Sequence, residues 1–301
     1  MIRRPPRSTL SSSSAASDVY KRQAQYSHCR NQLNGIVDIQ NDLKLGDATL
    51  KYSQVQYIQG VSLRSTTETN QTLVRISVGS TETKVLYLAY EIYPHAIAKN
   101  QNSFTAFNQY INLLFGPEFS YSFVSQIGRI SYLEVCKDYL SVKTSDILPH
   151  SAYSKFSDVY PGTQNHKLGS THAIYDKKLQ LHDVKSVESP WTQICRIEAK
   201  VRHTGLKVTE LHTLPNPLKN LELASMALLK ASNDPNFQQF LDRAQKVGVT
   251  TAMTTHTKYQ RKKLRHYLRE CAVPWFNPEQ IWTEWPRTVQ ALQSIAHQTA
   301  I

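Results

Sequence analysis

The most constraining feature of the sequence is the stretch Gln193–Arg202, which alternates between charged and apolar side chains. Charged residues stand at every second position from Arg196 onward, and the apolar residues from Cys195 to Val201 fill the positions between them. Because side chains of a β-strand point alternately to opposite faces, this pattern predicts a strand with one charged and one apolar face. Such a strand belongs in a sheet that buries only one side.

Other segments predict an α+β fold of antiparallel strands with helices segregated to one face. We expect further strands at Val55–Ile58, Leu73–Val78, Lys84–Ile92, Arg129–Tyr139 and Thr171–Asp176. Helical spacing of apolar residues predicts helices at Phe104–Leu114, Leu218–Ala231, Phe237–Val247 and His256–Cys271. No strand–helix alternation with a glycine-rich first turn is present, which argues against a doubly wound sheet.

Composition limits the class of protein. The 301 residues are 40% hydrophobic and 19% charged, as in a soluble chain that builds a core. No uninterrupted 18-residue apolar stretch occurs, so we expect no membrane insertion. The four cysteines are far apart without Cys-x-x-Cys spacing, so we interpret them as reduced thiols of a cytoplasmic protein.

The first 23 residues are set apart by their serine-rich, basic composition. They lack the apolar segment of a secretory signal, and Asp18–Gln23 resembles the translation of a DNA-sequencing adapter. We therefore expect residues 1–23 to be an artefact without a fold of its own, with the authentic start missing. The alternative is a natural basic arm for nucleic acid. The expected organisation continues with a β-rich unit at 24–125, a catalytic unit at 126–215 and a helical C-terminal region at 216–301.

The charge balance favours a polyanionic partner. The formal net charge is +12, and it remains +8 without the five basic residues and one acidic residue of the first 23. Basic residues that meet phosphates release condensed counterions, which makes nucleic acid a natural partner. The segment His256–Cys271 is especially rich in lysine and arginine. It predicts either a contact with the DNA backbone or a solvated helix face.

Three acidic residues could form a metal site. Glu134 and Asp138 share one face of their predicted strand, and Glu198 joins them if its strand is a neighbour. Converging carboxylates repel one another unless a cation neutralises them, and oxygen ligands suit Mg²⁺ or Mn²⁺. The alternative is that these are surface acids paired with nearby lysines.

Tyr175 is a candidate nucleophile. In an extended strand it shares a face with Lys177, and a nearby ammonium lowers the pKa of a phenol from about 10. A tyrosine activated in this way attacks phosphorus. The alternative is a packing residue with a solvated hydroxyl, since the chain has 16 tyrosines.

The order of these motifs resembles the Rep-trans family of rolling-circle replication initiators. The resemblance covers about 70 residues, from Arg129 to Arg202, and rests on the segments Tyr132–Asp138, Tyr160–Gly162, Ile174–Lys178 and Arg196–Lys200. It implies a sheet built from two ferredoxin-like or TBP-like units. The paired histidines of the related HUH nickases are missing, because no His-hydrophobe-His triplet occurs.

The resemblance implies a role for each matching residue. Tyr175 becomes the nucleophile, and Lys177 and Lys178 contact the phosphate. If Tyr175 is not the nucleophile, our next candidates are Tyr160 and Tyr153. The implied metal ligands are Glu134, Asp138 and Glu198. Two departures from the family stand out: Glu134 replaces a common Asp, and Gln180 replaces a common Glu. Asp176 or Asp183 is a conceivable substitute for that acid.

The implied function is site-specific nicking and religation of origin DNA, through a 5′-phosphotyrosine intermediate and a 3′-hydroxyl primer. Expected partners are double-stranded origin DNA with an exposed single-stranded loop, a host helicase and polymerase, and a second copy of the chain in a homodimer. We expect DNA contacts from Arg196, Lys200, Arg202, Lys258, Arg261, Lys262, Lys263 and Arg265. The alternatives are a conjugative relaxase of the same chemistry and a non-catalytic, basic DNA-binding regulator.

Overall fold

In a computed structural model of the chain, the structure describes residues 13–16, 48–55, 58–66, 71–80, 85–117, 120–151, 157–159, 165–185, 193–232 and 234–297. They belong to two compact units. The first takes its residues from Met1–Glu134, Val201–Leu214 and Glu284–Ile301, and the second from Val135–Lys200 and Pro215–Thr283. The boundaries cut through two strands, β6 (Arg129–Leu140) and β11 (Ile194–Arg202). The expected division was sequential, whereas the observed units are interleaved along the chain.

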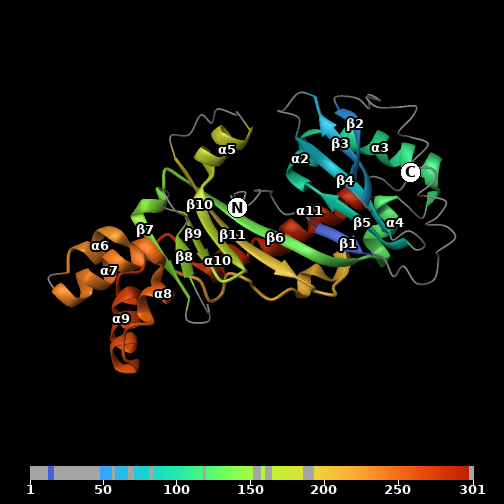
Figure 1. The fold of residues 1–301 in the computed structure, drawn as a ribbon. Helices are drawn as coiled ribbons and strands as arrows, with labels where there is room; N and C mark the ends of the chain where they lie inside the picture. The colour runs from blue at the N-terminus through green and yellow to red at the C-terminus, as the bar shows by residue number, and fades with distance from the viewer. Residues whose placement is uncertain are drawn as a thin grey trace. The chain divides into compact units, whose positions relative to one another are not determined.

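The first unit contains an antiparallel sheet in the order β2-β3-β4-β5-β1-β6 (Figure 1). Besides β6, its strands are β1 (Ser13–Ala16), β2 (Ala48–Val55), β3 (Ile58–Ser65), β4 (Thr72–Ser80) and β5 (Val85–Ile92). The strands expected at Leu73–Val78 and Lys84–Ile92 are confirmed as β4 and β5. The strand expected at Val55–Ile58 is wrong, because Val55 ends β2 and Ile58 begins its hairpin partner β3.

Helices of the first unit come from three segments of the chain, the first of which follows β5. They are α2 (Pro94–Lys99), α3 (Gln101–Phe115), α4 (Tyr121–Ile127), the 3₁₀ helix η4 (Val208–Thr213) and α11 (Trp285–His297). The expected helix at Phe104–Leu114 is confirmed as α3, which ends at Phe115 and is capped by Gly116 with a φ of 98° that favours glycine. Phe104, Phe107 and Ile111 on α3 are fully buried, since their spacing places them on one side of the helix.

Strand β1 corrects one expectation about the first 23 residues. Ser13–Ala16 pairs antiparallel with both β5 and β6, so the expectation of no regular structure is wrong for these four residues. The remainder of residues 1–23 lies outside the described residues.

The second unit contains the strand order β6-β11-β10-β9-β8, with the other strands at β8 (Ser157–Val159), β9 (His166–Leu168) and β10 (His172–Asp176). The expected strands at Arg129–Tyr139, Thr171–Asp176 and Gln193–Arg202 are confirmed as β6, β10 and β11. Ile174, Cys195 and Ile197 are fully buried on the apolar face of this sheet. The core therefore uses the apolar face that the alternation in β11 predicted.

A two-stranded sheet and a group of helices complete the second unit. The strands are β7 (Ile147–His150) and β12 (Glu222–Ser225), and the helices are α5 (Lys177–Lys185), α6 (Met226–Lys230), α7 (Pro235–Val247), α8 (Val249–Met253), α9 (Lys258–Glu270) and α10 (Pro278–Trp282), with the 3₁₀ turn η3 (Thr144–Asp146). Figure 1 shows α6 to α9 gathered beside β7. The helices expected at Phe237–Val247 and His256–Cys271 are confirmed as α7 and α9. The helix expected at Leu218–Ala231 is wrong over its first half, because Glu222–Ser225 pairs with β7 as a strand.

The architecture is mixed, with antiparallel sheets and C-terminal helices, which agrees with the expected α+β class. None of the described helices combines the length and apolar character of a membrane span. Cys136, Cys195 and Cys271 are free thiols, and Cys29 lies outside the described residues. Burial raises the pKa of the Cys195 thiol to about 12, so this side chain is an inert part of the core.

Candidate functional site

The register of β10 and β11 places the candidate nucleophile beside charged residues. Tyr175 is directly opposite Arg196, and Ala173 is directly opposite Glu198. Paired residues of neighbouring strands project to the same face, so Glu198 is a diagonal neighbour of Tyr175 within reach of its long side chain. The antiparallel pairing thus gathers side chains that are 23 residues apart in sequence.

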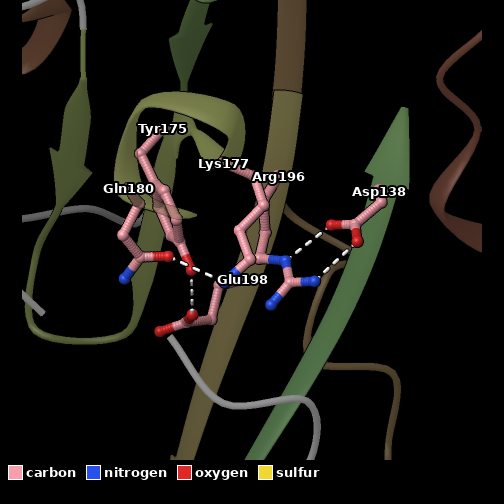
Figure 2. A network of polar contacts seen from close by, with 6 residues as sticks. All are labelled: Asp138, Tyr175, Lys177, Gln180, Arg196 and Glu198. Atoms are coloured by element: carbon pink, nitrogen blue, oxygen red, sulfur yellow. Dashed lines mark hydrogen bonds and ion pairs between the residues drawn. The ribbon is translucent and has the colours of Figure 1, made fainter. Parts of the chain in front are cut away.

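The phenol of Tyr175 is hydrogen-bonded to a buried carboxylate. Its hydroxyl donates to Oε2 of Glu198 at 3.0 Å (Figure 2). The Lys200 ammonium lies 3.2 Å from the other oxygen of this carboxylate, Oε1. Tyr175 is 4% exposed and Glu198 is fully buried. A buried carboxylate needs such partners, because desolvation of an unpaired charge is strongly unfavourable.

Arg196 is held by a bidentate salt bridge to Asp138 of β6. Nε donates to Oδ1 and Nη2 donates to Oδ2, each at 2.5 Å. Burial on its own would lower the pKa of the guanidinium, but the hydrogen bonds to Asp138 and the neighbouring acidic groups outweigh it and raise the pKa. Arg196 therefore stays charged between Asp138 and the strand that carries Tyr175, as Figure 2 shows.

A sharp turn from strand to helix follows Tyr175. Asp176 ends β10, and its Oδ1 accepts a hydrogen bond from the Leu179 amide at 3.0 Å, which caps the first turn of α5. Lys177 is consequently a helical residue, and the expectation that it shares a strand face with Tyr175 is wrong. Its ammonium is buried and donates to Oε1 of Gln180 at 2.8 Å. Lys178 is half-buried on the same helix.

The three acids expected to bind a metal do not form one ligand set. Asp138 is bound to Arg196, and Glu198 is bound to Tyr175 and Lys200. Glu134 accepts a hydrogen bond from Tyr132. Among the residues described, no three acidic, histidine or cysteine side chains group in a way that could hold a metal ion. These pairings resemble the salt-bridged alternative more than a cation site.

The residues expected to bind DNA occupy different environments. Arg196 is 2% exposed and Lys200 is half-buried, whereas Arg202 is exposed and lies over the Tyr132 ring at 5.8 Å. On α9, Lys258, Lys262 and Lys263 are exposed, and Arg261 and Arg265 are half-buried. The alternative nucleophiles Tyr153 and Tyr160 lie outside the described residues.

Sequence reasoning missed two partners within this site. Gln180 was treated only as a lost acid, yet it accepts from Lys177, and the three-residue spacing of this pair in a helix is the signal for the contact. Asn165 was not considered, although its side-chain oxygen accepts from the Asp176 amide at 2.9 Å and fixes the end of β10. Its position on a loop gives no local pattern that would have identified it.

No protein-family model matches the chain, and a comparison with curated proteins also found no match.

Proposed function

We propose that the chain is a site-specific DNA nickase that starts rolling-circle replication, with Tyr175 as its nucleophile. The observation that carries the proposal is the hydrogen bond from the Tyr175 phenol to the buried Glu198 carboxylate. A phenol is a poor nucleophile while it keeps its proton, and a carboxylate oxygen 3.0 Å away is placed to accept that proton. The pair supplies the nucleophile and the general base of a tyrosine transesterase.

In the proposed reaction, the Tyr175 oxygen attacks a phosphorus atom of the origin strand while its proton passes to Glu198. The bond between phosphorus and the 3′ oxygen breaks, and the 3′ oxygen takes a proton from water. The 5′ phosphate remains on tyrosine, and the free 3′ hydroxyl primes synthesis. Because the phosphotyrosine conserves the energy of the diester, the reverse reaction rejoins the strand without a nucleotide cofactor.

Cations beside the phenol support this chemistry. Negative charge grows on the phosphate oxygens in the transition state, and fixed positive groups stabilise it without reorganisation. Arg196 is opposite Tyr175 in the sheet, and Lys200 contacts Glu198. Lys177 at the start of α5 is the third candidate, since its ammonium lies beside the site and binds the Gln180 side chain.

Access to the phenol requires a local movement. Tyr175 is 4% exposed, so a DNA phosphate does not reach its oxygen in this conformation. Figure 2 shows Lys177 and Gln180 of α5 beside the Tyr175 ring. We expect α5 to move when DNA binds, which would expose the phenol and free the Lys177 ammonium for the phosphate.

A metal ion is kept as a separate prediction of the Rep-trans resemblance. The described carboxylates are already paired, so no step above passes through a metal. The same nicking assay in excess chelator tests this prediction: a requirement for Mg²⁺ or Mn²⁺ would mean that the carboxylates rearrange when DNA and metal bind together.

The remaining parts of the proposal follow from the same resemblance. The substrate is origin DNA with an exposed single-stranded loop, a host helicase and polymerase continue the reaction in the cytoplasm, and the sheet represents two ferredoxin-like or TBP-like units. A conjugative relaxase would use the same chemistry on another element.

A DNA-binding regulator without catalysis is the second candidate. It is favoured by the burial of Tyr175, Arg196 and Glu198 together, because each polar group already has a partner inside the protein. In a regulator this network would stabilise the sheet, and the positive charge of the chain would serve binding alone.

The decisive experiment uses supercoiled DNA that carries the gene's own flanking origin, with Tyr175→Phe compared against Tyr259→Phe. Tyr259 is a matched control, because its side chain is 80% exposed on α9. We expect Tyr175→Phe to lose nicking and the covalent protein–DNA adduct while keeping origin binding, and Tyr259→Phe to behave as the unaltered protein. An adduct retained in Tyr175→Phe would move the nucleophile, with Tyr160 or Tyr153 next. An unaltered protein that binds but never nicks would favour the regulator.

A further inference from the structure

A polar cavity in the second unit is not used by the proposed nicking reaction. Its volume is about 160 Å³, below the roughly 300 Å³ at which pockets for drug-sized ligands begin. Two strands and two helices supply its lining. Strand β7 ends at the cavity, β12 begins at it, and α8 and α9 form its walls. The lining residues are His150, Ser151, Glu222, Val249, Thr250, Met253, Thr254, Arg261, Arg265 and Arg269.

Three arginines of α9 give the cavity an excess of positive charge. Arg261, Arg265 and Arg269 follow one another at intervals of four residues, which places them along one face of the helix. Arg269 pairs with Glu222 at 3.2 Å. Within the part of the chain that the structure describes, neither Arg261 nor Arg265 forms an ion pair. The cavity thus sets three guanidinium groups against one carboxylate.

The arginines of α9 that line the cavity differ in exposure from the lysines on the other side of the same helix. Lys262 and Lys263 are exposed and line no part of the cavity, whereas Arg261 and Arg265 are half-buried and line its wall. An arginine partly withdrawn from water and left without an acid favours an anion that binds beside it.

His150, a buried residue of the cavity lining, carries an unpartnered polar atom. The residue is 4% exposed, and its Nδ1 lies 3.3 Å from Oε2 of Glu222. Its Nε2 is shielded from solvent and has no hydrogen-bond partner among the described residues. An unsatisfied buried polar atom is unfavourable, so a ligand that pairs with Nε2 once the ring shifts towards the cavity relieves that cost.

The protonation of His150 determines which ligand atom pairs with Nε2. Burial lowers its pKa to about 4, opposed by Glu222 and assisted by Arg269 and Arg265, so the ring is neutral near pH 7. In a neutral ring, the Glu222 carboxylate 3.3 Å from Nδ1 favours the proton on that nitrogen, which leaves a lone pair on Nε2. The matching ligand atom is therefore a hydrogen-bond donor.

We propose that this cavity binds a phosphate group that carries its own proton, either inorganic phosphate or the terminal phosphate of a small monoester such as a nucleotide. Arginine forks match the phosphate oxygens, and the P–OH of a monoprotonated phosphate donates to Nε2 of His150. The phosphodiester of a DNA backbone has charged oxygens but no such hydrogen. The proposal is independent of nicking and makes the cavity a second anion site in the same unit.

Calorimetric titration of the full chain with inorganic phosphate, and separately with a nucleoside monophosphate, tests this proposal. Arg265→Gln removes one charge from the cavity, and Lys263→Gln removes one charge from the exposed side of the same helix. We expect saturable phosphate binding that Arg265→Gln weakens at least tenfold, that Lys263→Gln leaves unchanged, and that Tyr175→Phe also leaves unchanged. Thermal unfolding without phosphate checks that each variant folds, and Arg261→Gln serves as the second cavity variant.

Two results would overturn the proposal. One is no saturable binding of either phosphate compound to the unaltered protein. The other is equal weakening by Arg265→Gln and Lys263→Gln, which would describe general attraction to a positive helix. A short duplex without terminal phosphates provides the last comparison: if it displaces inorganic phosphate from the cavity, the site recognises backbone diesters and the proposed ligand is wrong.

Discussion

Two clusters of positive charge lie in the second unit, and they differ in whether an acid neutralises each cation. On β11, Arg196 is paired with Asp138 and Lys200 with Glu198. On α9, Arg269 has Glu222, but Arg261 and Arg265 have no ion pair within the described residues. The strand places its charges against the core, and the helix places its charges at the edge of a cavity.

This difference separates two uses of a cation. A buried pair such as Arg196 and Asp138 fixes side chains in one arrangement, and removal of either partner leaves the other uncompensated. Cations without a neighbouring acid can bind a ligand, because no carboxylate of the protein competes with the ligand for them. The β11 cluster is therefore suited to orient groups around Tyr175, and the α9 cluster is suited to attract an anion.

The largest expected effect is on the nicking rate when Glu198, the proposed general base on β11, is replaced. Glu198→Gln keeps the shape of the side chain but cannot accept the phenol proton, so we expect the nicking rate to fall by about 10²–10⁴-fold. Single-turnover rates on labelled origin DNA measure this, with the exposed Glu279→Gln as control. A rate that falls by less than tenfold would leave Glu198 as a structural partner of Tyr175.

The free energy of unfolding should depend more on a buried ion pair than on an exposed one. Asp138→Ala leaves Arg196 charged and nearly fully buried, and we expect a loss of about 2–4 kcal/mol in the free energy of unfolding, reduced because Asp138 is itself 35% exposed. Glu270→Ala breaks the exposed pair with His266 on α9 and should change stability by less than about 1 kcal/mol. Denaturant unfolding compares them, and equal losses would contradict the distinction.

Acid should destabilise the protein through two buried histidines. Burial lowers the pKa of His166 to about 4, and that of His150 is lowered to about 4 as well. As pH falls below about 6.5 the unfolded chain takes up protons first, so each histidine removes about 2 kcal/mol of stability between pH 7 and pH 5.

Variants assign this acid sensitivity to individual histidines. His166→Gln should reduce the loss measured between pH 7 and pH 5, while the exposed His182→Gln should not. Added phosphate should raise stability without reducing the part of the loss that is due to His150, because the proposed ligand pairs with the neutral ring. A pH dependence that is the same in all variants would show that other groups dominate.

The smallest expected effect is on the salt dependence of duplex binding. If Lys258, Lys262 and Lys263 meet backbone phosphates, their replacement by Gln should flatten the slope of log affinity against log salt by about 0.9 per lost contact, equally for origin and random duplex. Arg196→Gln should change the slope less, because Asp138 already neutralises that charge. An unchanged slope in the lysine variant would make the exposed side of α9 a solvated face.

Local pattern was enough to predict the strands β4, β5, β6, β10 and β11 and the helices α3, α7 and α9, because alternation and helical spacing record which side of an element is buried. It failed at Leu218–Ala231, where apolar residues suit a helix but β7 offers Glu222–Ser225 a strand partner. It failed also at Val55–Ile58, where β-branched residues mark the ends of two strands rather than one strand. Long-range pairing decided both cases.

The sequence named the residues of the candidate site but did not determine how these residues pair with one another. Alternation in β11 placed Arg196, Glu198 and Lys200 on one face, but that face was expected to be open, and Glu198 is fully buried. The partners of these groups, Asp138 and Tyr175, come from separate strands, and only the pairing of the sheet determines which acid meets which cation. The α9 cavity was not predicted, because His150 and Glu222 are distant from the helix in sequence.

Because the two units are interleaved along the chain, we expect them to unfold together. The polypeptide passes between units after Glu134, Lys200, Leu214 and Thr283, so each unit is assembled from separate pieces of chain. No single truncation removes one unit and leaves the other whole, and a nick in a connecting segment leaves both units with all their pieces. We therefore expect heat to melt the chain in one cooperative transition, and shortened versions that end near residue 215 to lose the order of both halves at once.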